Sequence, residues 1–173
     1  MKNTKSILSK GLILIFVTAL VMVGGKVTFA DENACHYCGM KKAMFGHSWV
    51  MIEREDGSSV GVCSIHCAAV DMALNIDKPA QKITVGDYNS KMQIEAENAY
   101  WVIGGSKMGV MTARAKWAFE SKESADAFMK QFGGRPATFD EVMKAAFEDM
   151  YEDTLMIQKK RKMMRMKKAK SNS

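Results

Sequence analysis

The sequence lacks the residue arrangements that most enzymes need. We find no general acid–base pair, no glycine-rich phosphate loop and no nucleophile set beside a base. There is also no low-complexity linker and no exact internal repeat. The 173 residues include only two prolines, four cysteines and three histidines. We therefore assign no reaction and predict that the chain is not an enzyme.

Acidic residues are absent from both ends of the chain. Residues 1–30 contain four lysines, residues 156–173 contain eight lysines and arginines, and neither segment contains Asp or Glu. Subtracting these twelve charges from the total of +6 leaves −6 for residues 31–155. The positive excess thus belongs to a basic, Met-rich tail, which predicts contact with an acidic surface or with the surface of a membrane. A solvated helix end is the alternative.

The N-terminus predicts export. Lys2, Lys5 and Lys10 precede an apolar run over residues 11–25, and Thr-Phe-Ala at residues 28–30 provides a small-x-small cleavage site. This pattern is typical of a secretory signal peptide over residues 1–30, and the run is short for a membrane span. We expect the protein in the periplasm or on the outer face of the cell envelope, anchored if the signal is not cleaved. Nucleic acid is then not an expected partner.

All four cysteines fall in two short clusters, each of which contains a histidine. The first is Cys-His-Tyr-Cys-Gly-Met at residues 35–40, and the second is Cys-Ser-Ile-His-Cys at residues 63–67. Thiols with imidazole suit Cu(I), zinc or iron–sulfur chemistry, and a thioether favours Cu(I). His36 is expected to face solvent. The candidate metal ligands are Cys38 and Met40, completed by His66 or His47 and by one or more of Cys35, Cys63 and Cys67.

Two other interpretations of the cysteines remain open. In an exported protein Cys35, Cys63 and Cys67 are equally suited to disulfides. Four thiolates closing one Zn²⁺ site would make a structural module for protein interaction. A thiol–disulfide oxidoreductase using the Cys-x-x-Cys pair is the weakest alternative, because that motif should open a helix, whereas a strand is expected here.

The pattern of residues predicts an α+β fold built from small antiparallel sheets with packed helices. A strand over residues 47–55, a turn at Asp56-Gly57 and a strand over residues 58–62 form a hairpin. This hairpin should carry residues 63–67 back towards residues 35–40. Ser64 is placed to cap a helix that ends near Asn75, and the start of that helix should stabilise a thiolate at Cys63 or Cys67.

The second half of the chain repeats this order of strands and helix. Pro79 and Gly86 are expected to frame a loop, followed by strands over residues 92–96, 99–103 and 110–118 and by a helix over residues 125–132. Thr138 and Glu141 form a capping box for a long C-terminal helix. We therefore expect two similar ββα-type units. The predicted parts are a signal peptide (1–30), a metal-binding unit (31–78), a second α+β unit (79–155) and the basic tail (156–173).

An ordered set of short motifs resembles the NosL family, the accessory copper proteins of nitrous oxide reductase assembly. The motifs are Cys-His-Tyr-Cys-Gly-Met, Phe-Gly-His-Ser-Trp-Val, Ala-Tyr-Trp-Val-Ile-Gly-Gly, Met-Gly-Val-Met and Gly-Gly-Arg, between about residues 35 and 139. The resemblance implies an exported α+β Cu(I) metallochaperone that hands copper to a metalloenzyme or its assembly complex. It implies sulfur ligation by Cys38 and Met40 with a histidine nearby. The second cysteine cluster and the basic tail are additions to that pattern.

Overall fold

The structure is a computed structural model that describes residues 33–171, so the predicted signal peptide lies outside the described residues. None of the helices in this part of the chain combines the length and the apolar character needed to cross a bilayer. The elements, in chain order, are α2 (Lys42–Phe45), η1 (Gly46–Ser48), β1 (Val50–Arg54), β2 (Ser59–Val62), α3 (Ile65–Leu74), β3 (Ala80–Gly86), β4 (Gln93–Glu95), β5 (Tyr100–Ile103), β6 (Lys116–Phe119), α4 (Lys122–Phe132), β7 (Arg135–Ala137) and α5 (Phe139–Ser171).

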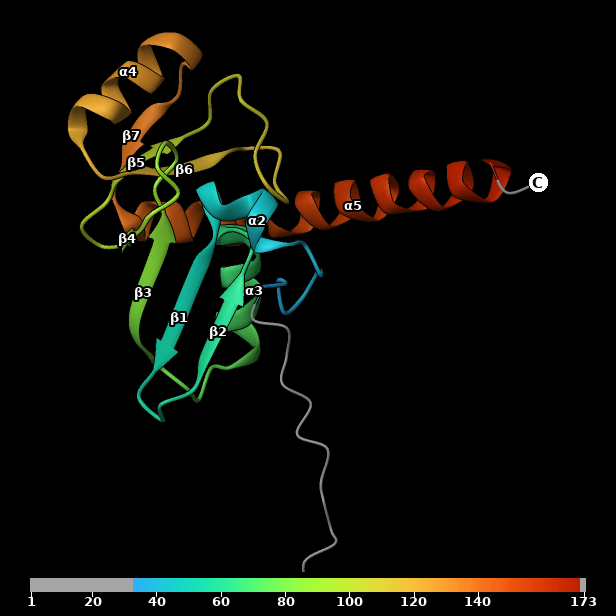
Figure 1. The fold of residues 1–173 in the computed structure, drawn as a ribbon, viewed down its shortest axis with the longest axis horizontal. Coiled ribbons are helices and arrows are strands. Elements are labelled where there is room, and N and C mark those ends of the chain that lie inside the picture. The colour runs from blue at the N-terminus through green and yellow to red at the C-terminus, as the bar shows by residue number, and fades with distance from the viewer. Residues whose placement is uncertain (1–32, 172–173) are drawn as a thin grey trace, which may run out of the picture.

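Two small antiparallel sheets organise the fold, as predicted (Figure 1). The first has the strand order β2-β1-β3-β4 and the second has the order β6-β5-β7. Helix α3 packs on β1 and β2, whereas α4 packs on β5 and β6. The predicted α+β class with a long C-terminal helix is confirmed. The division at residue 78 stays a prediction, although β3 and β4, which follow it in sequence, pair into the first sheet.

The first hairpin forms where the turn signal lies. The amide of Arg54 donates to the carbonyl of Ser58 at 2.9 Å, and the amide of Ser58 donates to Asp56 Oδ1 at 2.8 Å. Along β1 the buried residues alternate with more exposed ones. Val50 and Ile52 therefore face the core, where they meet Trp49 and, across the sheet, Val85.

Several local expectations were wrong, among them that a strand is the first element after the Cys-x-x-Cys motif, where α2 and η1 form instead. Residues 80–86, expected as a loop, form β3, which pairs with β1 from Ala80 to Val85 with one register shift between Glu53 and Arg54. The expected strand over residues 110–118 is irregular up to residue 115 and becomes β6 only at Lys116. His47 lies in the 3-10 helix η1 and not at the start of a strand. In each case pairing with a distant segment, or its absence, decided the local conformation over propensity.

Hydrogen bonds from the loop after β3 link the first sheet to β6 of the second sheet. Asp87 is 3% exposed, and its carboxylate accepts from the amides of Asn89 and Ser90, from the Ser90 hydroxyl and from the amide of Glu120 beside β6. Burial raises the pKa of Asp87, but these hydrogen bonds outweigh it and the pKa lies below its usual value. Tyr88 adds a bond from its amide to the carbonyl of Ala118 at 2.8 Å.

A close approach between two backbone segments requires glycine at position 86, the last residue of β3. A Cβ atom at this position would lie 1.8 Å from the carbonyl oxygen of Gly46 in η1. The Gly86 amide also donates to the carbonyl of Trp49 at 2.8 Å. Only glycine fits here without moving η1 away from the sheet.

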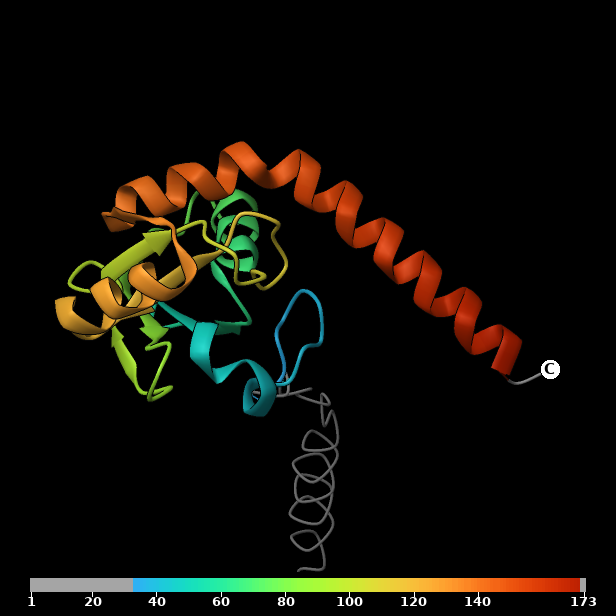
Figure 2. The ribbon, with the colours of Figure 1, turned by 90° about the horizontal axis from the view of Figure 1, so that it is seen from above.

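Helix α5 begins at the predicted capping box. The amide of Thr138 donates to Glu141 Oε2 at 2.8 Å, and the amide of Glu141 donates to Thr138 Oγ1 at 3.3 Å. The first part of α5 packs beside α3, and the helix then extends away from the rest of the chain (Figures 1 and 2). The predicted basic tail is therefore the outer part of this helix as far as Ser171.

Candidate metal centre

The four cysteine sulfurs form one group. The Sγ atoms of Cys35, Cys38, Cys63 and Cys67 all lie within 4.8 Å of one another. Cys38 Sγ is 3.4 Å from Cys63 Sγ, which is 3.7 Å from Cys67 Sγ. Four sulfurs around a metal at about 2.3 Å are about 3.8 Å apart in a tetrahedron. The group thus has the size of a single metal-binding shell.

Residues 35–40 form a tight knuckle that presents the first two thiols. The amide of Cys35 donates to the carbonyl of Met40 at 2.8 Å, and the amide of Gly39 donates to the carbonyl of Cys35 at 2.9 Å. Gly39 has a φ of +75°, a conformation that favours glycine. The amide of His36 donates to the carbonyl of Gly61 at 3.2 Å, which fastens the knuckle to β2.

The other two thiols come from the end of β2 and the start of α3. Cys63 follows Val62 directly, and its carbonyl accepts from the buried Ser48 hydroxyl at 2.8 Å. Cys67 lies in the first turn of α3. Ser64 is the N-cap residue, as predicted, although its side chain makes no capping hydrogen bond. The predicted hairpin therefore returns residues 63–67 to residues 35–40.

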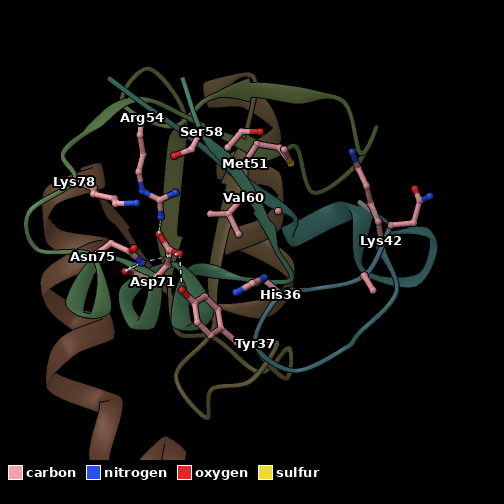
Figure 3. Close-up of a pocket in the computed structure, with 14 residues that line it drawn as sticks. His36, Tyr37, Lys42, Met51, Arg54, Ser58, Val60, Asp71, Asn75 and Lys78 are labelled. Atoms are coloured by element: carbon pink, nitrogen blue, oxygen red, sulfur yellow. Dashed lines mark hydrogen bonds and ion pairs between the residues drawn. The ribbon is translucent and has the colours of Figure 1, made fainter. Parts of the chain in front are cut away.

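A buried ionic network ties the knuckle to the sheet and to α3 (Figure 3). Tyr37, which lies between the two knuckle cysteines, donates from its hydroxyl to Asp71 Oδ1 at 2.5 Å. The guanidinium of Arg54 on β1 donates to the other oxygen of Asp71. Asp71 on α3 is 2% exposed and Arg54 is 7% exposed. Burial and the bond to Asp71 both raise the pKa of Tyr37, which is therefore a neutral donor at physiological pH.

Figure 3 also shows the pocket that borders this network, with a volume of about 610 Å³. The basic side chains of Lys42, Arg54 and Lys78 line it together with His36 and Tyr37 of the knuckle. The described residues that line this pocket include none of the four cysteines. The pocket therefore lies beside the sulfur group and does not open onto it.

Hydrogen bonds among the thiols distribute the protons unevenly. Bonds from Cys38, Cys63 and Cys67 hold the pKa of Cys35 below its ordinary value. The bond with Cys35 raises the pKa of Cys38, but bonds from Cys63 and Cys67 outweigh it and lower the pKa to about 7. Bonds to Cys35 and Cys38, followed by burial, raise the pKa of Cys63 and of Cys67. The pKa values of the knuckle thiols therefore lie below those of the thiols at the start of α3, and the expected thiolate at Cys63 or Cys67 stays a prediction.

Accessibility separates one thiol from the other three. Cys35, Cys63 and Cys67 are 2%, 0% and 2% exposed and belong to the core of the first sheet. Cys38 is half-buried at the edge of that core. All four cysteines are free thiols in the structure, without the disulfides weighed above. A soft metal ion held by the group would thus be shielded from water on three sides and accessible beside Cys38.

The two candidate histidines do not join the sulfur group. His66 is buried, and its Nδ1 atom lies 3.5 Å from Asp153 Oδ2 on α5. Burial lowers the pKa of His66 more than Asp153 raises it, so the imidazole is neutral. His47 packs among the rings of Phe45, Tyr88 and Trp117, and burial followed by the charge of Lys91 lowers its pKa.

His36 and Met40 of the knuckle lie closer to the surface than the buried cysteines. His36 is exposed, as expected, and contacts the ring of Tyr37. Met40 is half-buried and packs against the core cluster that contains the three buried cysteines. Its role as a ligand stays a prediction. Sequence reasoning missed Arg54, Asp71 and Asp153, because nothing in their local patterns distinguishes a buried ionic partner from an ordinary surface charge.

The fold and the site define a class: a small α+β protein with four cysteines gathered into a group suited to a soft metal. The model of the NosL family matches residues 26–147, and the chain belongs to this family. The resemblance drawn from the motifs is thus confirmed. The structure is similar to the crystal structure of the copper chaperone NosL from Shewanella denitrificans, with a TM-score of 0.55, 25% identity, and coverage of 70% of this chain and 98% of that chain. No curated protein matches the sequence.

Proposed function

We propose that this protein is an exported copper chaperone that binds Cu(I) through its cysteine group and delivers it to a metalloenzyme of the cell envelope. The observation that carries the proposal is the convergence of four thiol sulfurs within 4.8 Å. Membership of the NosL family and the likeness to a protein described as a copper chaperone support it. We propose nitrous oxide reductase, or its assembly complex, as the recipient on the basis of the family alone.

The uneven burial of the thiols suits a cargo that has to be released. Thiolates are soft ligands that Cu(I) prefers, and Cys35, Cys63 and Cys67 are buried away from solvent. A ligand of the recipient protein reaches the metal beside the half-buried Cys38, where Met40 is the nearest thioether in sequence. Copper leaves by stepwise replacement of sulfur ligands. As copper leaves, the thiols that gave up a proton on binding take one up again, and no other bond in the protein is made or broken.

A structural zinc module is the second candidate. The observation that favours it is the burial of three of the four thiols, because structural zinc sites are closed tetrahedra of thiolates. Metal removal distinguishes the two, since a structural zinc site holds the fold together. The oxidoreductase alternative has less support, because residues 35–40 form a knuckle and the next helix begins only at Lys42.

The test is an anaerobic titration of the reduced protein with Cu(I) against a Cu(I)-selective chelator, repeated with Zn²⁺. We expect one tightly bound Cu(I), with weaker binding in Cys38→Ser and in Met40→Leu. Met44→Leu is the matched control, because Met44 is near the knuckle in sequence but 70% exposed, and it should bind as the parent does. Circular dichroism should show a folded protein before and after the metal is removed.

The proposal fails if the reduced protein does not bind Cu(I), or if it binds Zn²⁺ tightly and unfolds on chelation. Equal binding by the parent and by Cys38→Ser would remove Cys38 from the ligand set. Loss of binding in Cys38→Ser but not in Met40→Leu would leave an all-thiolate site. Each result assigns the ligands independently of the identity of the recipient.

A further inference from the structure

Within the part of the chain that the structure describes, the outer segment of α5, residues 158–171, does not pack against the body of the protein. The buried residues of α5 end at Asp153, and every residue from 158 to 171 is exposed. At 1.5 Å per residue this segment is about 21 Å long. Figures 1 and 2 show it extending away from both sheets. Its eight basic side chains are exposed and lie away from the described body, so another surface can reach them.

The outer segment is strongly and uniformly positive. It carries eight lysines and arginines and no acidic residue. Lys159, Lys160, Arg161 and Lys162 are consecutive, so basic side chains point to every side of the helix, which completes a turn in 3.6 residues. Within residues 33–171 no ion pair includes any of these eight side chains. The net charge of −6 over residues 31–155 therefore does not draw the segment back onto the body.

The apolar residues of the outer segment do not form a stripe. Met163 and Met166 are three residues apart and share a face, whereas Met164 lies on another side. They are 47%, 54% and 61% exposed, respectively. An apolar groove on a protein binds helices through anchors repeated at i, i+3, i+4 and i+7 on one face. This pattern is missing, so the segment is poorly suited to such a groove.

Binding to an anionic lipid surface does not require a stripe of apolar anchors on one face of the helix. Long basic side chains from several sides reach lipid phosphates, and flexible methionine side chains insert between headgroups without a fixed register. The segment also lies beyond the NosL family match, which ends at residue 147. The basic helix is therefore additional to the part of the chain that the family shares.

We propose that residues 158–171 form a membrane-surface helix that binds anionic phospholipid headgroups and holds the cysteine group next to the lipid surface. The binding is electrostatic, because each Lys or Arg near an anionic surface strengthens partition by a factor of about five, and added salt weakens it. The segment does not cross the bilayer. This inference is independent of the metal that the protein binds.

The test compares hydrogen–deuterium exchange of the full chain with and without vesicles. One set is pure phosphatidylcholine, and the other contains phosphatidylcholine and phosphatidylglycerol at about two to one. We expect slower exchange in residues 158–171 with the anionic vesicles alone, and reversal of this effect by added salt. Peptides from this segment report on the helix itself, whatever the N-terminal leader does.

Two variants that remove the same charge complete the test. In one, Lys159, Lys160, Arg161 and Lys162 become Gln, which should weaken partition to anionic vesicles by on the order of 100-fold or more. The control replaces the exposed Lys78, Lys107, Lys130 and Lys144 by Gln and should change partition little. Both variants should bind metal as the parent does, so a failure of the copper proposal leaves this result interpretable.

Three outcomes would overturn the inference. The first is no protection of residues 158–171 by anionic vesicles, and the second is equal protection by neutral vesicles. The third is an equal loss of partition in the control variant, which would assign the effect to overall charge. Protection by polyglutamate without protection by vesicles would instead assign the segment to an acidic protein partner.

Discussion

Replacing Asp71 by Asn removes the negative charge that neutralises the buried guanidinium of Arg54. Arg54 and Asp71 are 7% and 2% exposed, so water compensates only partly for the lost partner. Breaking a buried ion pair from one side costs about 3–5 kcal/mol, because a charge stays buried without compensation. The amide also weakens the bond from Tyr37, which joins the knuckle to α3. We therefore expect Asp71→Asn to lower the free energy of unfolding by about 4 kcal/mol.

The assay is thermal and urea unfolding of the reduced, metal-free protein, followed by circular dichroism. For a chain of this size the expected change corresponds to a fall in Tm of roughly 10 °C or more. Asp56→Asn is the matched control, because Asp56 pairs with Lys78 at 3.7 Å but both side chains are about half exposed. Breaking that pair should cost less than about 1 kcal/mol.

A second pair of variants tests the physical cause. Arg54→Met with Asp71→Leu removes both charges, and it should recover much of the stability lost in Asp71→Asn, since no unpaired charge remains. Equal effects of Asp71→Asn and Asp56→Asn would refute the reasoning, because they would show that burial does not strengthen the interaction. Failure of the double variant to recover stability would assign the loss to packing.

Three further predictions follow from the fold and the site. Asp87→Asn should lower the free energy of unfolding by about 2 kcal/mol at neutral pH. Because the pKa of Asp87 is lowered in the folded protein, its contribution to stability is present above the ordinary pKa near 3.9 and is lost as the pH falls through the folded pKa. The parent should therefore lose more stability on acidification than the variant. Gly86→Ala should destabilise the fold by about 2 kcal/mol or more, because its Cβ would collide with the Gly46 carbonyl, and an unchanged Tm would contradict this. Metal binding should release protons from the two thiols with raised pKa, so that affinity increases with pH, and calorimetry in buffers of different ionisation enthalpy should detect the release.

Much of the fold was predictable because its signals are local. The Asp-Gly turn, the Thr138–Glu141 capping box and the glycine that ends α4 are each encoded within a few residues. β3 was not predictable in this way, because residues 80–86 become a strand through pairing with β1, about 30 residues earlier in the chain. The flanking Pro79 and Gly86 suggested a loop, and long-range pairing overrode that suggestion.

The sequence by itself indicated the candidate metal-binding residues: two cysteine clusters, joined by a hairpin short enough to bring them together, within a set of motifs typical of NosL proteins. Only the tertiary structure decided which side chains meet. It gathered the four sulfurs, turned His66 towards Asp153, and buried Asp71 against Arg54. The physical reason is that turns and caps depend on neighbours in the chain, whereas burial and side-chain direction depend on how separate elements pack.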